Sequence, residues 1–246
     1  IKRDDNLIIR DRYKTAPFSF DQNGIPRSPH PAYHANHGTR GFNVYSCTGT
    51  NWIAISQSWM GQWVTVFTVA EDGSLVRQWE QNLGNPGDAG ILEINNHLAI
   101  ESGEIWQIMG IDGDGNVELV GDTDQPLTAD GAFREGVLYC AGNGMFRIFI
   151  IGDEVDQIDL ISEIEIRGER VYLHENAAYV PVPDGLEIID ISDIEAPEPV
   201  QTFQLEHGAR RMDFENNRAV VSLVNSIVLL DLSEPFEPEI TGWYNM

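Results

Sequence analysis

The chain has 246 residues, of which 39 are acidic and 15 are Lys or Arg, and its formal net charge is −24. So acidic a surface excludes sequence-independent nucleic-acid binding, which needs clustered cations to release the counterions of the phosphate backbone. No apolar run is long enough for a transmembrane helix, so no membrane span is expected. A hydrophobic fraction of 42% is enough for a folded core.

Residues 1–37 are expected to form an extended N-terminal strap. Asn6–Tyr13 could be a strand, but prolines and glycines interrupt the residues that follow. His30, His34 and His37 lie within eight residues of each other. Three imidazoles could hold Zn or Cu, and a loop with hydrogen-bonding histidines is the alternative.

Five similar segments follow, near residues 38–87, 88–128, 129–166, 167–206 and 207–246. The last two align directly, because Asn176–Asp193 matches Asn217–Glu234 at a constant offset of 41 residues. Each copy holds about four short runs rich in β-branched and aromatic residues, separated by Gly, Asn, Asp or Pro. Four strands per repeat of about 40 residues predict an all-β fold, a β-propeller of five four-stranded blades over residues 38–246. Six blades, with a partial N-terminal blade, are the alternative.

The second copy contains Asp112, Asp114 and Asn116, which resemble the start of a calcium loop with oxygen ligands. A tight turn is the competing interpretation, because Asp-Gly also occurs in the first copy at the corresponding hairpin. The two cysteines, Cys47 and Cys140, are too few for a disulfide framework and are expected to be small buried hydrophobes.

Arginines recur where copies begin, at Arg40, Arg170, Arg210 and Arg211. His37-Gly-Thr-Arg40 and His207-Gly-Ala-Arg210 are alike. These side chains could ring one mouth of the propeller channel and, with His207, bind an anionic ligand. Ion pairing with the abundant Asp and Glu between blades is the alternative.

Two strand endings carry a resemblance to a known family. Leu186–Asp193 with Pro197 and Pro199-Val200, and again Ile227–Gly242, resemble the LVIVD repeat of bacterial and archaeal β-propellers. The resemblance implies a propeller fold and an extracytoplasmic location, periplasmic, cell-surface or secreted. It brings no catalytic residues. The strongly acidic charge is compatible with a saline environment.

The sequence contains no Gly-x-Ser-x-Gly elbow and no Walker loop, and its many carboxylates do not single out a catalytic pair. We therefore expect a non-catalytic binding or assembly module, a scaffold that contacts a protein partner or identical subunits. A five-bladed hydrolase (a glycoside hydrolase or lactonase-like enzyme) and a metal-binding propeller are the alternatives. No cofactor is predicted beyond Ca or Zn/Cu at the sites above, and a small anionic or glycan ligand is considered.

Overall fold

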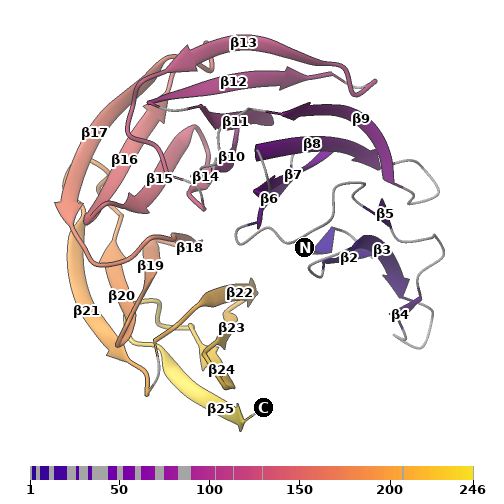
Figure 1. Cartoon of the computed structure of the whole chain (residues 1–246). Coiled ribbons are helices and arrows are strands. Elements are labelled where there is room, and N and C mark those ends of the chain that lie inside the picture. The colour runs from indigo at the N-terminus through magenta and orange to yellow at the C-terminus, as the bar shows by residue number, and fades with distance from the viewer. Residues whose placement is uncertain are drawn as a thin grey trace. The chain divides into compact units, whose positions relative to one another are not determined.

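The structure is a computed structural model whose described residues form strands and no helix (Figure 1). The described residues are 2–3, 6–10, 14–20, 26–27, 33–34, 44–48, 52–58, 62–69, 75–82, 90–102, 104–112, 114–128, 130–206 and 208–245. Within them no helix is long and apolar enough to cross a membrane. The chain divides into two compact units, residues 1–124 and 125–246, and each unit is described by itself.

Unit 1 contains one five-stranded and two four-stranded antiparallel sheets. The N-terminal residues, expected as a strap, contribute the strands of the five-stranded sheet. Its strands are β1 (Lys2–Arg3), β2 (Asn6–Arg10), β3 (Lys14–Phe20), β4 (Pro26–Arg27) and β5 (Tyr33–His34). The four-stranded sheets are β6 (Val44–Thr48), β7 (Trp52–Ser58), β8 (Gln62–Val69) and β9 (Leu75–Asn82), followed by β10 (Ile91–Ile94), β11 (His97–Ser102), β12 (Ile105–Ile111) and β13 (Val117–Thr123).

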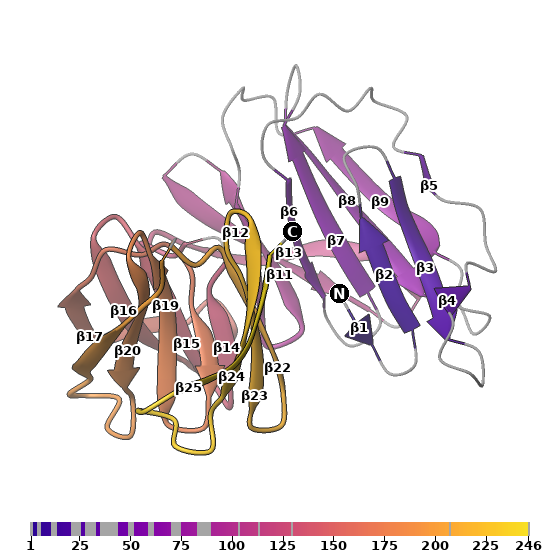
Figure 2. The ribbon, with the colours of Figure 1, turned by 90° about the horizontal axis from the view of Figure 1, so that it is seen from below.

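Unit 2 contains three four-stranded antiparallel sheets, each an uninterrupted meander in chain order. The first is β14 (Ala132–Arg134), β15 (Val137–Gly142), β16 (Met145–Ile151) and β17 (Ile158–Glu165). The second is β18 (Tyr172–His174), β19 (Ala177–Val182), β20 (Gly185–Asp190) and β21 (Glu198–Gln204), and the third is β22 (Arg211–Glu215), β23 (Arg218–Ser222), β24 (Ser226–Asp231) and β25 (Glu239–Asn245). Figure 2 shows the three sheets of this unit side by side. The expectation of an all-β chain built from four-stranded antiparallel sheets is confirmed.

The meanders follow from short turns whose residues accept the left-handed conformation. Asn143 and Gly144 join β15 to β16 with φ angles of 54° and 79°. Glu175, at φ 48°, opens the turn between β18 and β19. Such turns match the twist of the strands that they join, so each repeat folds locally into hairpins.

Adjacent sheets of unit 2 share their cores. Leu186 and Ile188 of β20 pack with residues of the third sheet, while Ile189 packs with Phe146 and Ile148 of the first sheet. These five side chains are completely buried. This packing explains the nearly continuous apolar sequence of β20, because both faces of the strand are covered.

The Asp-x-Ser sequence that ends β20 and β24 forms the same turn in both copies. The carboxylate of Asp190 accepts hydrogen bonds from the Ser192 backbone N–H and hydroxyl, at 2.8 and 2.6 Å. Asp231 accepts the equivalent pair from Ser233, at 2.9 and 2.6 Å. These bonds lower the pKa of the Asp231 carboxyl group, since they favour its charged form.

In each of the five four-stranded sheets, the last strand in chain order carries a β-bulge, which the sequence did not reveal. The register shifts at an equivalent point in β9, β13, β17, β21 and β25. The bulge residues, which have no partner opposite them in the ladder, are Gln78, Val120, Ile161, Val200 and Thr241. A bulge increases local twist and makes an open sheet edge a poorer template for pairing with another chain.

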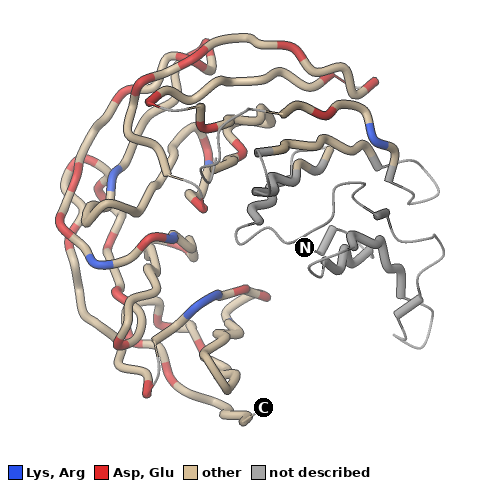
Figure 3. Tube along the Cα trace, in the orientation of Figure 1, with Lys and Arg blue, Asp and Glu red and all other residues tan. Residues whose placement is uncertain are grey.

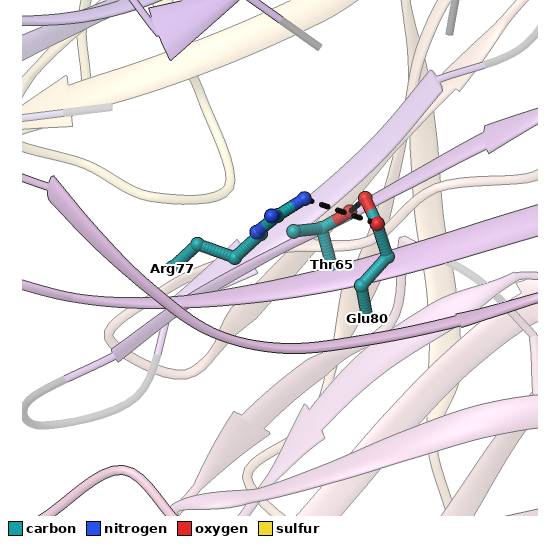
Figure 4. A network of polar contacts seen from close by, with 3 residues as sticks. All are labelled: Thr65, Arg77 and Glu80. Carbon is teal, nitrogen blue, oxygen red and sulfur yellow. Dashed lines mark hydrogen bonds and ion pairs between the residues drawn. The ribbon is translucent and has the colours of Figure 1, made fainter. Parts of the chain in front are cut away.

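In β9 the bulge also creates a polar network (Figure 4). Arg77 and Glu80 are three residues apart and would point to opposite faces of a regular strand. The bulge at Gln78 places them opposite Phe67 and Thr65, on one face. The Arg77 guanidinium then lies 3.1 Å from the Glu80 carboxylate, and the Thr65 hydroxyl donates to the same carboxylate at 3.3 Å.

Candidate functional site

Three of the arginines predicted as an anion site lie in unit 2, where two successive sheets begin. Arg170 precedes β18, Arg210 precedes β22, and Arg211 is the first residue of β22. The Arg170 guanidinium donates a hydrogen bond of 3.5 Å to the backbone carbonyl of Arg210. The structure thus brings these two segments, 40 residues apart in sequence, into contact. The other predicted members, Arg40 and His207, lie outside the described residues.

Asp130, which the sequence analysis missed, fixes the position of Arg170. Its carboxylate forms an ion pair of 2.8 Å with the Arg170 guanidinium, and both side chains are 26% exposed. The Asp130 carbonyl accepts a further hydrogen bond of 3.3 Å from the Val171 N–H. Asp130 therefore holds both the backbone and the side chain of the segment that leads into β18. Its position at the start of the third copy was the only available sequence signal.

A second ion pair involves Arg167, which lies in the same connection, between β17 and β18. The Arg167 guanidinium is 3.1 and 3.2 Å from the two carboxylate oxygens of Asp184. Asp184 belongs to the turn between β19 and β20, and its carbonyl accepts from the Leu205 N–H at 3.0 Å. The pair is largely exposed. It therefore contributes only about 0–1 kcal/mol to stability, and its main effect is to link neighbouring connections.

Arg210 and Arg211 differ from these paired arginines. Both are exposed, and no described carboxylate forms an ion pair with either. The Arg210 N–H donates to the Ser222 carbonyl at 2.9 Å, which fixes the backbone at the start of β22. Arg170 is paired with Asp130, so Arg210 and Arg211 are the guanidinium groups at this edge without an ion pair to a described carboxylate.

Two glycines let the arginine-bearing connections pack tightly. A Cβ at Gly168 would lie 2.1 Å from a Val180 methyl carbon and 2.7 Å from the Pro181 carbonyl oxygen. A Cβ at Gly208 would lie 2.5 Å from the Pro183 carbonyl oxygen. Only glycine fits at such close backbone approach. Both connections are therefore pressed onto the end of the β19–β20 hairpin.

An aromatic cluster joins β18 to β22 beside this edge. The His174 and Phe214 rings stack at 5.6 Å with an interplanar angle of 7°, and Tyr172 and Tyr179 contact Phe214 at 6.4 and 6.0 Å between ring centroids. The buried Tyr179 hydroxyl donates to the Pro235 carbonyl at 2.5 Å. Burial of this hydroxyl raises the pKa of Tyr179 well above its ordinary value. The cluster fixes the strand that follows Arg170 against the strand that follows Arg210.

The predicted calcium residues form a turn in unit 1. The Asp112 carboxylate accepts from the N–H groups of Asp114 and Asn116, each at 2.9 Å, and from the Asn116 side-chain amide at 2.7 Å. These bonds lower the pKa of the Asp112 carboxyl group. Gly115 of this turn packs on Gln78 and Thr68.

The predicted histidine cluster is not described at the side-chain level. His30 and His37 lie outside the described residues, and His34 is described only as part of the backbone of β5. Within the part of the chain that the structure describes, no group of three or more His, Cys, Asp and Glu residues is placed to share a metal ion.

Solved structures share this fold at low sequence identity. A protein from Bacteroides fragilis, provisionally named a 6-phosphogluconolactonase, matches with a TM-score of 0.76 and 14% identity over 100% of this chain and 83% of that one. The periplasmic gluconolactonase of Pseudomonas aeruginosa matches with a TM-score of 0.71 and 12% identity over 97% and 79%. A protein from Lactobacillus plantarum matches with a TM-score of 0.76 and 11% identity over 98% and 81%.

The fold is propeller-like. No protein-family model matches the chain, and no curated protein matches it. The resemblance to the LVIVD repeat therefore stays a prediction.

These comparisons contradict the expected non-catalytic binding module. Three of the similar structures are named as lactonases, two of them provisionally, which favours the hydrolase alternative over a scaffold. The expectation rested on the lack of a catalytic motif. That reasoning fails in a repeat fold, because each connection contributes a few side chains to a shared edge and no contiguous motif arises.

Proposed function

We propose that this protein is a hydrolase that opens a sugar lactone. The observation that carries the proposal is the fold likeness, which extends over 97–100% of the chain to a gluconolactonase and to a protein provisionally named a 6-phosphogluconolactonase. As part of the proposal, the five four-stranded sheets are propeller blades and the sheet β1–β5 is a sixth.

The arginine edge of unit 2 suits the charges of this reaction. Water attacks the lactone carbonyl carbon, the ring C–O bond breaks, and the products are a hydroxyl group and a carboxylate. Negative charge develops on the carbonyl oxygen, and fixed cations near that oxygen lower the barrier. Arg210 and Arg211 are exposed, and each carries a guanidinium group with donors for an oxyanion.

The proposed reaction uses water as its only co-substrate. His30, His34 and His37 remain a predicted Zn or Cu site, and Asp112, Asp114 and Asn116 a predicted Ca site, both testable by elemental analysis of the purified protein. The proposal includes a location outside the cytoplasm. It is supported by the periplasmic gluconolactonase among the similar structures.

The test is a pH-stat assay with gluconolactone and 6-phosphogluconolactone, in which each hydrolysis releases one acid equivalent. The purified chain should release acid well above spontaneous hydrolysis for one of the two lactones, and heat-unfolded protein should not. Release at the spontaneous rate with both lactones would refute the proposal.

A further inference from the structure

The arginines of unit 2 divide into those with acceptors and those without. Arg147 and Arg167 are paired with Glu163 and Asp184. Arg170 is paired with Asp130. Arg134 donates to the Glu175 carbonyl at 2.6 Å and lies over the Tyr139 ring, and Arg218 is opposite Asp231 in the β23–β24 ladder. Arg210 and Arg211 have no side-chain acceptor among the described residues, and the residue opposite Arg211 in the ladder is Ser222, not a carboxylate.

This exception is notable in a chain with a net charge of −24. Figure 3 shows acidic segments in every sheet of unit 2, whereas the start of β22 is a continuous basic segment. Neither arginine forms an ion pair with a described carboxylate, although the exposed Asp213 lies two residues after Arg211 in β22. Their exposure leaves the guanidinium donors available to a ligand.

The backbone at the arginine pair is held by contacts from two sides. The Arg210 backbone is held by Ser222 on one side and contacted by the Arg170 guanidinium on the other. Gly208 itself lies directly against the Pro183 backbone. Because the backbone is held, ligand binding would have to order only the two side chains, which lowers the entropic cost of binding.

We infer that Arg210 and Arg211, with Arg170 beside them, form a binding site for the oxyanion group of a small metabolite. Guanidinium donors match the paired oxygens of a carboxylate or a phosphate group. The inference deepens the proposed function, on which the origin of the ligand rests: the carboxylate is the group that lactone opening creates, and a phosphate group would come from a phosphorylated sugar. Asp130 serves as a positioning residue for Arg170.

Isothermal titration calorimetry tests the site without turnover, with gluconate for the carboxylate arm and inorganic phosphate for the phosphate arm. The double variant R210A/R211A should bind the preferred anion roughly tenfold or more weakly than the wild type, since charge-assisted hydrogen bonds are lost. Arg218→Ala is the matched control. Arg218 is an exposed arginine at the first residue of β23, and Ser222, at the last residue of that strand, is the one opposite Arg211. The control variant should bind like the wild type, and circular dichroism should confirm that all variants are folded.

The inference is overturned if the wild type binds neither anion, if the double variant binds as tightly as the wild type, or if R218A weakens binding equally. Binding that depends on Arg210 and Arg211 in a protein without lactonase activity would uphold the site and remove the proposed function. Lactonase activity without arginine-dependent binding would uphold the proposed function and remove the binding site.

Discussion

Gly208→Ala tests whether the connection before β22 is packed as closely as the structure indicates. The added Cβ would meet three backbone atoms of Pro183, at 2.5, 2.8 and 2.9 Å. Ordinary van der Waals contact begins near 3.4 Å, so one segment must move by about 0.9 Å. Pro183 lies in the turn between β19 and β20, whose ladder continues to Val182 and Gly185, so the neighbouring backbone resists this movement.

Overpacking of this kind typically costs about 1–3 kcal/mol, and backbone neighbours place Gly208→Ala near the upper end, about 2–3 kcal/mol. For a chain of this size a loss of that order lowers Tm by about 5–10 °C. The displaced segment carries Arg210, so binding of the oxyanion probe should weaken at the same time.

Differential scanning calorimetry measures the stability change, with Gly242→Ala as the matched control. The nearest atoms to a Cβ at Gly242 are side-chain carbons of Tyr244 and Leu229, at 3.2 and 3.3 Å, which can shift. The control should therefore stay within about 0.5 kcal/mol of the wild type. Equal Tm values for Gly208→Ala and the wild type would show that the connection does not pack on Pro183.

Three further predictions concern the core and two titrating groups. Ile188→Ala, at a fully buried position, should lower the free energy of unfolding in urea by about 2–5 kcal/mol. Ile240→Ala is the control, and because Ile240 is 48% exposed it should lower this free energy far less. Similar losses in the two variants would contradict the shared core of the second and third sheets. Burial raises the pKa of the Cys140 thiol from 9.0 to about 11. Its contribution to stability is thus complete below pH ~8.5, the unfolded thiol's range, and is lost as pH rises toward 11; alkylation of the Cys140 peptide in native protein at pH 8, followed by mass spectrometry, would contradict this burial. Ser233→Ala should raise the pKa of Asp231 part of the way towards its ordinary value of 3.8 in a carboxyl NMR titration, because the hydroxyl hydrogen bond is lost while the backbone N–H bond remains. The wild-type bonds stabilise the fold above that ordinary value, and their contribution is lost as pH falls through the lowered pKa, so a titration unchanged by the substitution would exclude the Ser233 hydroxyl as a cause of the lowered pKa.

Much of the fold was predictable because the signals that define it are local. The turns at Asn143-Gly144 and at Asp190 depend on residues next to each other in the chain, and their side-chain chemistry is legible in the sequence. The nearly continuous apolar sequence of β20 is likewise a local signal, since such a sequence is typical of a strand that is covered on both faces. The bulges were not predictable, since their position depends on how an outermost strand meets the register of its neighbour.

The candidate site was only partly predictable. Repeat alignment found Arg170 and Arg210, because equivalent positions in successive copies have equivalent places in the fold. It could not separate a paired arginine from an unpaired one. That distinction depends on Asp130, 40 residues from Arg170, and on the docking of one sheet's connection against the next.

The sequence by itself therefore determined the strands, the turns and the recurring arginines, since these follow from residue types and spacing along the chain. The tertiary structure alone decided which arginines are neutralised, which glycines must remain glycines, and which known proteins the chain resembles in shape. The physical reason is that ion pairs and close backbone contacts act through space between sheets, where residues distant in sequence meet.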